Sequence, residues 1–141
     1  MTKLLKLAGA SALLCLAFAI PAPAQINNSV NFTTPFSFYA GNTKLPAGSY
    51  KVTPAGFDNT VLTIESTNGS HSAFVEYTPT QAGSGHKATD VGFKKYGTTE
   101  VLNTVWIEGQ QFGMQMQITK FEQSLAKSGA PTTHSVAAKG K

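Results

Sequence analysis

The sequence is poor in the residue types on which disulfides, metal–thiolate sites and nucleic-acid contacts depend. Its 141 residues include one cysteine, Cys15, and no arginine. Cys15 lies in an N-terminal segment that we expect to be removed, so the remaining chain has no thiol for a disulfide or a metal. Arginine is the residue that best forms paired hydrogen bonds to phosphate and to guanine, and its absence argues against a nucleic-acid-binding protein.

Charge is sparse as well. Charged residues make up 13% of the chain, and the formal net charge is +4 at pH 7. Lys3 and Lys6 belong to the segment that we expect to be removed, and subtracting them leaves a charge of about +2. A charge this small provides no electrostatic footprint for nucleic acid. We therefore predict no nucleic-acid partner.

Sequence motifs of catalysis are also missing. The chain contains no Gly-x-Ser-x-Gly, no phosphate-binding loop that ends in Lys-Ser or Lys-Thr, and no His-Glu-x-x-His. A metal site formed by His71, His86 and Asp90 is conceivable, but their spacing is not diagnostic, and the third histidine, His134, lies in the C-terminal tail. We expect solvated histidines, no catalytic residue, no metal and no cofactor.

Residues 1–24 have the pattern of a cleaved signal peptide. Lys3 and Lys6 precede an apolar run over residues 7–20, and Ala22-Pro23-Ala24 places small residues where a signal peptidase cuts. The apolar run is short for a bilayer core of roughly 30 Å, so we favour cleavage over a transmembrane anchor. Cleavage here predicts a single-domain protein, exported to the periplasm or the extracellular space, with no membrane span.

Short apolar alternations bounded by glycine, proline and asparagine predict an all-β domain over residues 25–127. In residues 30–38 the even positions are mostly apolar, which is the period of a strand with one buried face, and Pro35 indicates a sheet edge. Leu45-Pro46-Ala47-Gly48 suits a type I turn that leads into the next strand. Turns at a spacing of roughly 8–12 residues are typical of an antiparallel β-sandwich or, as the alternative, of a small β-barrel.

The clearest turn signal is Asn68-Gly69, the pair preferred in a two-residue type I′ hairpin. The register that this turn imposes pairs Ile64 with Ala73 and Leu62 with Val75, so that the apolar residues share one face. Turn chemistry and hydrophobic pattern therefore predict the same hairpin.

The same register places Glu65 and Glu76 on the polar face of this hairpin, nearly opposite each other. A pair of carboxylates could act as in a glycosidase. Because nothing nearby would raise the pKa of either group, we favour two charges on a solvated sheet face.

Two further hairpins are expected at Gly97-Thr98 and at Gly109-Gln110, the second with glycine first as a type II′ turn prefers. The residue pairs that they predict across the strands are Lys95 with Glu100 and Val105 with Met114.

Trp106 is the candidate binding residue. The hairpin register places it opposite Gly113, where a large ring can cover the exposed backbone. A flat face with one aromatic ring and several amides is suited to sugar binding. The alternative, which we favour in a sandwich of this size, is that a second sheet covers the ring. The candidate ligand-binding residues are Trp106, Gln111, Gln115 and Gln117.

The C-terminal region predicts a short helix over residues 121–127 and then a disordered tail over residues 128–141. The tail is rich in Ala, Ser, Thr, Gly and Lys and has few apolar residues to anchor it.

The chain resembles a group of small exported bacterial proteins that have no assigned activity. The resemblance is carried by Phe32-x-x-x-Phe36 with Pro35, by Gly41-Asn42-x-x-Leu45-Pro46-Ala47-Gly48-x-Tyr50, by Tyr96-Gly97 and by the strand of Trp106. The Leu-Pro-Ala-Gly-Ser-Tyr piece is also similar to a turn in Cna-B-type and carboxypeptidase regulatory-like β-sandwich modules, which implies a fold class only.

The sequence therefore favours a non-enzymatic exported interaction or structural protein. Its partners would be a protein or an envelope polysaccharide, or further copies of itself joined at a sheet edge such as residues 32–39. The alternatives are a carbohydrate-binding module that uses Trp106 and a small secreted hydrolase.

Overall fold

The computed structural model describes residues 29–55, 60–82 and 86–140, so the predicted signal peptide lies outside the described residues. The elements are β1 (Val30–Thr34), β2 (Phe38–Ala40), β3 (Thr43–Leu45), β4 (Gly48–Ala55), β5 (Val61–Ser66), β6 (Ser72–Gln81), β7 (Asp90–Tyr96), β8 (Thr99–Trp106), β9 (Phe112–Met116), α1 (Lys120–Ala126) and β10 (Thr132–Gly140). Within the described part of the chain, no helix has the length and apolar character to cross a membrane.

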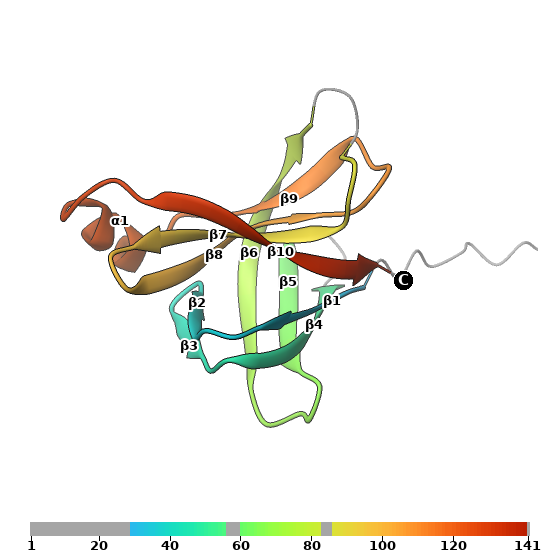
Figure 1. The fold of residues 1–141 in the computed structure, drawn as a ribbon, viewed down its shortest axis with the longest axis horizontal. Helices are drawn as coiled ribbons and strands as arrows, with labels where there is room; N and C mark the ends of the chain where they lie inside the picture. Colours follow the sequence, from blue (N-terminus) through green and yellow to red (C-terminus); the bar gives the residue numbers. More distant parts are fainter. Residues whose placement is uncertain (1–28, 56–59, 83–85, 141) are drawn as a thin grey trace, which may run out of the picture.

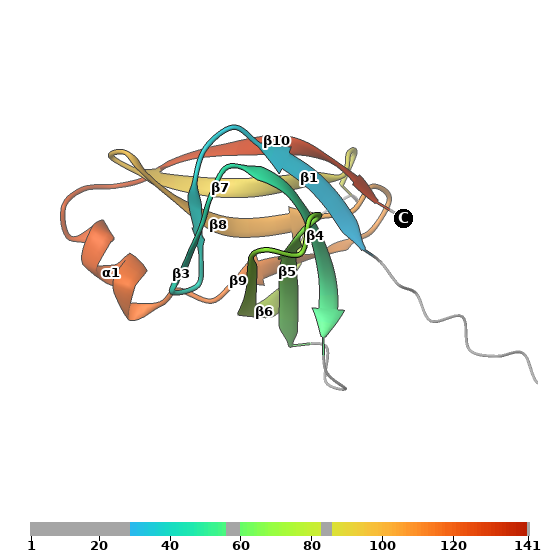
Figure 2. The same ribbon diagram turned by 90° about the horizontal axis from the view of Figure 1, so that it is seen from below.

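Eight strands close into an antiparallel barrel. Their order is β8-β7-β10-β1-β4-β5-β6-β9, and pairing of β9 with β8 completes the ring. In Figure 1, β7, β8 and β10 run across the direction of β5 and β6, and Figure 2 shows the same strands wrapping around a common interior. The all-β prediction is confirmed, and the closed barrel matches the alternative fold; a two-sheet sandwich is not what the strands form.

The predicted sheet edge near Pro35 is wrong. β1 pairs with β4 on one side and with β10 on the other, so it is an interior strand of the barrel. The strand at the end of the sheet order is β3, which pairs with β2, while β2 lies beside the first half of β8 through a parallel pairing of Tyr39 with Val101. The outermost strand at this end of the sheet is therefore β3, three residues long, whereas β6 is paired on one side at a time, with β5 over residues 72–76 and with β9 over residues 77–81.

Aromatic side chains fill the interior of the barrel. The rings of Phe32, Phe38, Tyr50 and Phe93 lie with centroids 5.2–6.2 Å apart, and all four residues are buried. An eight-stranded barrel is just wide enough to be filled by side chains in this way. The hydroxyl of Tyr50 donates to the carbonyl of Pro46 and so holds the predicted corner before β4.

The β5–β6 hairpin has the predicted register. Ile64 pairs with Ala73 and Leu62 pairs with Val75. Its turn is longer than predicted, because Ser66 N–H donates to the His71 carbonyl at 2.8 Å and leaves a four-residue loop. Gly69 takes a φ of +74°, which glycine adopts without strain. The loop differs from a type I′ turn but encloses an even number of residues, so the register is preserved.

The other two hairpins also keep their predicted pairs, Lys95 with Glu100 and Val105 with Met114. The second turn is shifted, since Gln110 N–H donates to the Ile107 carbonyl at 3.1 Å and Gly109 is then the third residue of the turn. The β7–β8 ladder shifts register between Gly92 and Phe93, and Asn103 is the extra residue of this bulge.

The C-terminal region differs most from its prediction. The helix is present as α1, close to the predicted range, and begins where the Thr119 hydroxyl accepts from the Glu122 N–H at 3.1 Å. The predicted disordered tail is wrong, because Thr132–Gly140 forms β10 between β7 and β1. Its composition is poor in apolar residues, but its backbone groups pair with two strands that lie far away in the sequence.

Candidate functional site

A shallow groove crosses the outer wall of the barrel over β10, β7 and β8. Its floor is Gly92, whose missing side chain leaves space that the neighbouring Thr104 occupies; a Cβ at Gly92 would lie 2.2 Å from Thr104 Oγ1. The groove has a volume of about 330 Å³, at the low end of the range for small-ligand sites. Its polar lining includes Asn103, Thr104, Thr133 and Ser135.

Trp106 forms one end of this groove. Its indole lies face-on against the backbone of Gly113, as predicted, because a Cβ there would be 2.4 Å from Cε3 and 2.7 Å from both Cδ2 and Cζ3. The imidazole of His86 stacks on the indole with centroids 4.7 Å apart and planes 13° from parallel. Trp106 is half-buried, neither free on the surface nor covered by a second sheet.

His86 is held over Trp106 by a carboxylate. Its Nε2 lies 2.9 Å from Asp90 Oδ2, and Asp90 is the cross-strand neighbour of Trp106. The groove is therefore bounded at this end by an imidazole–indole stack with a hydrogen-bonded carboxylate. This arrangement offers aromatic, amide and hydroxyl groups for a polar ligand.

The three predicted glutamines lie at different points around this end of the wall. Gln115 pairs with Thr104 and lies two residues beyond Gly113, so it shares the outward face with Trp106. Gln111 belongs to the turn, where its carbonyl accepts from Ala82 N–H at 2.9 Å, and Gln117 follows the end of β9. All three side chains are exposed, and none of them lines the groove.

The metal hypothesis is not supported by the arrangement of its residues. His86 and Asp90 bind each other, whereas His71 belongs to the β5–β6 loop. Among residues 29–55, 60–82 and 86–140, no group of three or more His, Cys, Asp or Glu side chains is placed to hold a metal ion.

The glycosidase-like pair is wrong in its geometry. Glu65 lies opposite Ser72 and Glu76 lies opposite Val61, so the two carboxylates are four residues apart along the ladder. At about 3.3 Å per residue their backbone positions lie roughly 13 Å apart, so the residues are not opposite each other, whereas the carboxyl groups of glycosidases lie roughly 5–9.5 Å from each other.

A second surface on the outer wall is apolar. Phe74 lies on the outward face of β6 between the buried residues Ala73 and Val75, and it is 70% exposed. With Val61, Glu76 and Gln117 it lines a groove of about 370 Å³. Ile118, which follows directly in the chain, is 54% exposed.

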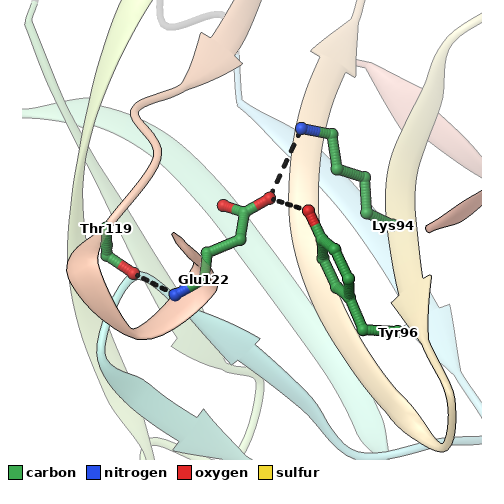
Figure 3. A network of polar contacts seen from close by, with 4 residues as sticks. All are labelled: Lys94, Tyr96, Thr119 and Glu122. Carbon is green, nitrogen blue, oxygen red and sulfur yellow. Dashed lines mark hydrogen bonds and ion pairs between the residues drawn. The ribbon is translucent and has the colours of Figure 1, made fainter. Parts of the chain in front are cut away.

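Two buried acidic residues, Glu122 and Glu100, link distant elements, and Figure 3 shows the contacts of Glu122. Glu122 of α1 is buried, and its Oε1 accepts from the Tyr96 hydroxyl at 2.9 Å and from Lys94 Nζ at 3.3 Å. Burial and the Glu122 carboxylate together raise the pKa of Tyr96 to about 12. These contacts fasten α1 to the outer face of β7.

Glu100 makes the second link. It is buried on β8, and its Oε2 lies 2.6 Å from His134 Nε2 of β10. The His134 imidazole also packs against Phe36 and Phe93, with centroid distances of 5.3 and 5.8 Å. Among the residues that the structure describes, the contact of His134 with Glu100 is the one side-chain hydrogen bond between β10 and the barrel wall.

No known protein family, curated protein or solved structure matches this chain. The resemblance to small exported bacterial proteins therefore stays a prediction.

Sequence reasoning found Trp106 and Gly113 but missed their neighbours. His86 lies in a glycine-rich stretch that gave no periodic signal, and it reaches Trp106 because its N–H donates to the Gln110 carbonyl at 3.2 Å. His134, Val136 and Ala138 recur at every second position, which is the period of a strand, and they are the half-buried positions of β10.

Proposed function

We propose that the chain is a non-enzymatic exported interaction protein of the cell envelope or extracellular space, and that it binds a protein partner through the outer wall of its barrel. Export is supported by the signal-peptide pattern of residues 1–24. The packed aromatic interior supports binding on the outside rather than inside the barrel.

The observation that carries the proposal is Phe74. An aromatic ring that is 70% exposed in the middle of a regular strand gains nothing for the fold, since its neighbours Ala73 and Val75 form the core. Single exposed apolar residues are common, but this ring lines a groove together with Val61. Gln117, which lines the same groove, directly precedes the exposed Ile118. Aromatic residues at the centre of an interface often dominate its affinity.

Capture of partners from a native envelope extract tests the proposal. The immobilised exported protein should retain a defined partner, and Phe74→Ser should weaken that binding by roughly tenfold or more, as expected for an interface anchor. Phe112→Ser is the matched control, because Phe112 is 56% exposed but lies on β9, away from the Phe74 groove.

Equal retention of the partner by Phe74→Ser and by the unchanged protein would contradict the proposed surface. Turnover of a substrate by the purified protein, abolished by one substitution on the outer wall, would contradict the non-enzymatic assignment.

A second candidate is carbohydrate binding at the Trp106 groove. It is supported by the amide and hydroxyl groups of Asn103, Thr104 and Ser135 beside an indole. The imidazole of His86 covers indole surface of Trp106 on which a sugar ring would otherwise stack. A sugar would therefore bind mainly by hydrogen bonds along the groove.

Titration with envelope oligosaccharides, followed by tryptophan fluorescence, tests this candidate. Trp106 is the only tryptophan of the chain, so a saturable change reports on the groove directly. Ser135→Ala should weaken the response and Gln111→Ala, outside the groove, should not. An unchanged spectrum at high glycan concentration would exclude this function.

A further inference from the structure

β10 is attached to the barrel in an unusual way. Of the eight barrel strands, β10 is the one in which no described residue is fully buried. Its least exposed residues, His134, Val136 and Ala138, are half-buried. Every other barrel strand buries at least two residues. β10 is thus held mainly by its backbone hydrogen bonds.

These hydrogen bonds are divided unequally between two neighbours. β10 pairs with β7 over six residue positions, from Thr132 to Ala137, and with β1 over only three, from Ala138 to Gly140. A groove of about 550 Å³ opens beside the short β1–β10 seam, lined by Asn31, Thr33, Ala137 and Lys139 among others. With three residue pairs, this seam is one of the two shortest in the barrel; the other is β8–β9, with two.

The segment that leads into β10 is exposed, and it lines a shallow groove together with the turn between β7 and β8. Residues 127–130 are exposed, and their backbone N–H groups bond to the end of α1: those of Lys127 and Ser128 donate to the Leu125 carbonyl and that of Gly129 donates to the Ala126 carbonyl. Pro131 favours an extended Ala130. In extended form, the five residues 127–131 would span roughly 17 Å.

We propose that β10 exchanges between copies of this chain, so that the β10 of one molecule occupies the slot between β1 and β7 of another. The slot fits this strand in particular. His134 lies opposite Phe93 in the register, where it contacts the Glu100 carboxylate and the rings of Phe36 and Phe93. Every copy carries that strand, and the exchanged form makes the same contacts as the closed monomer.

The balance between the two forms depends on concentration. Exchange gains no new contacts in the slot, so its cost is the entropy of association and any change in the linking segment. The inference does not depend on the proposed partner surface, because Phe74 lies on β6, outside the slot.

Cysteine trapping tests the exchange directly. The exported form beginning at Gln25 has no cysteine of its own. In Lys94→Cys with Thr133→Cys, the two new thiols face each other across β7 and β10. The protein is incubated at a series of concentrations and then oxidised, and the products are separated under denaturing, non-reducing conditions. Exchange predicts a disulfide-linked dimer whose fraction rises with concentration.

The matched control is Glu65→Cys with Ser72→Cys, which face each other within the β5–β6 hairpin. Because a short loop joins these strands, oxidation should give the intramolecular product at every concentration. The β10 pair should exceed this control several-fold in linked dimer. Lys95→Cys with Thr132→Cys provides a second pair across β7 and β10 if the first perturbs folding. If both β10 pairs give only the intramolecular product at all concentrations, strand exchange is excluded.

Discussion

β5 and β10 belong to the same barrel but are held in it by different forces. β5 pairs along its length with β4 and β6, and it buries Leu62 and Ile64 completely. β10 pairs mostly with β7 and buries no residue completely. Burial of one Leu or Ile side chain contributes about 1.5–3 kcal/mol, whereas a backbone hydrogen bond contributes about 0.5–1.5 kcal/mol net.

The strands of a closed barrel therefore need not all be equally stable against local unfolding. Strands with buried side chains unfold only when the core does, whereas a strand held by its backbone opens at lower free energy. Here the weaker strand is the one that closes the ring between β1 and β7. Closure of the barrel and stability of its core are therefore separable properties.

Truncation of one core-facing residue in each strand should give the largest difference in stability between β5 and β10. Ile64→Ala on β5 should lower the free energy of unfolding by about 2–5 kcal/mol, because the removed atoms leave a cavity in a packed interior. Val136→Ala on β10 should cost about 1 kcal/mol or less, since Val136 is half-buried. Urea denaturation of both variants measures the contrast; equal losses would show that β10 is anchored as firmly as β5.

β9 is held in a third way, by a ring of the neighbouring strand that packs on its backbone. Its buried residues are Gly113 and Met116, and the indole of Trp106 covers Gly113. Gly113→Ala should destabilise the protein by about 1–3 kcal/mol, because the new methyl group collides with the ring. The control Gly97→Ala adds a methyl group where no atom lies within 4 Å and tests only the cost of φ +62°.

A double substitution separates the ring contact from other effects of Gly113→Ala. In a Trp106→Ala background the indole carbons that the added methyl group would meet are absent, so Gly113→Ala should then cost less. Additive losses in urea denaturation would mean that the indole is not what excludes a side chain at 113.

The sequence predicted the strands that are held by side chains and missed the strand that is not. In the β5–β6 hairpin, the turn residues Asn68-Gly69 and the alternating apolar residues lie within one short stretch, so local reasoning recovered the register. Thr132–Gly140 has small polar side chains, and its partners β1 and β7 lie far away in the chain. Pairing between distant backbones leaves little trace in composition.

The same limit applies to the candidate site. Trp106 and Gly113 come from one hairpin, and the register alone placed the ring over the glycine. His86 reaches that ring from a loop whose path depends on hydrogen bonds to the neighbouring turn. The all-β class and three hairpin registers could therefore be predicted, whereas the choice of a barrel over a sandwich and the groove at β10 could not.

His134 is the residue through which side-chain anchoring of β10 can be removed. His134→Ala leaves the buried Glu100 carboxylate without this partner, which should cost about 1–2 kcal/mol. Hydrogen exchange should quicken in β10 more than in β5, whereas Thr132→Ala, at an exposed position of the same strand, should change neither. Uniform acceleration in both strands would indicate loss of global stability instead of local release of β10.

The smallest expected change in stability concerns α1. This helix immediately precedes the segment that leads into β10. The pKa of Tyr96 is raised to about 12 from its usual value near 10, so the fold favours the protonated phenol. The stability that this supplies is fully present below about pH 10 and is lost as the pH rises through about 12. Tyr96 is partly exposed, so we expect on the order of 1 kcal/mol.

Two variants test this linkage by phenolate absorbance and by unfolding at several pH values. Tyr96→Phe should reduce the loss of stability between about pH 10 and 12, leaving a remainder to which Tyr50 and Tyr77 contribute, because burial raises the pKa of both phenols. Glu122→Gln should lower the pKa of Tyr96, since it removes a negative charge 2.9 Å from the phenol oxygen while burial remains. An unchanged phenolate titration in Glu122→Gln would show that burial alone raises the pKa and that Glu122 does not hold α1 through Tyr96.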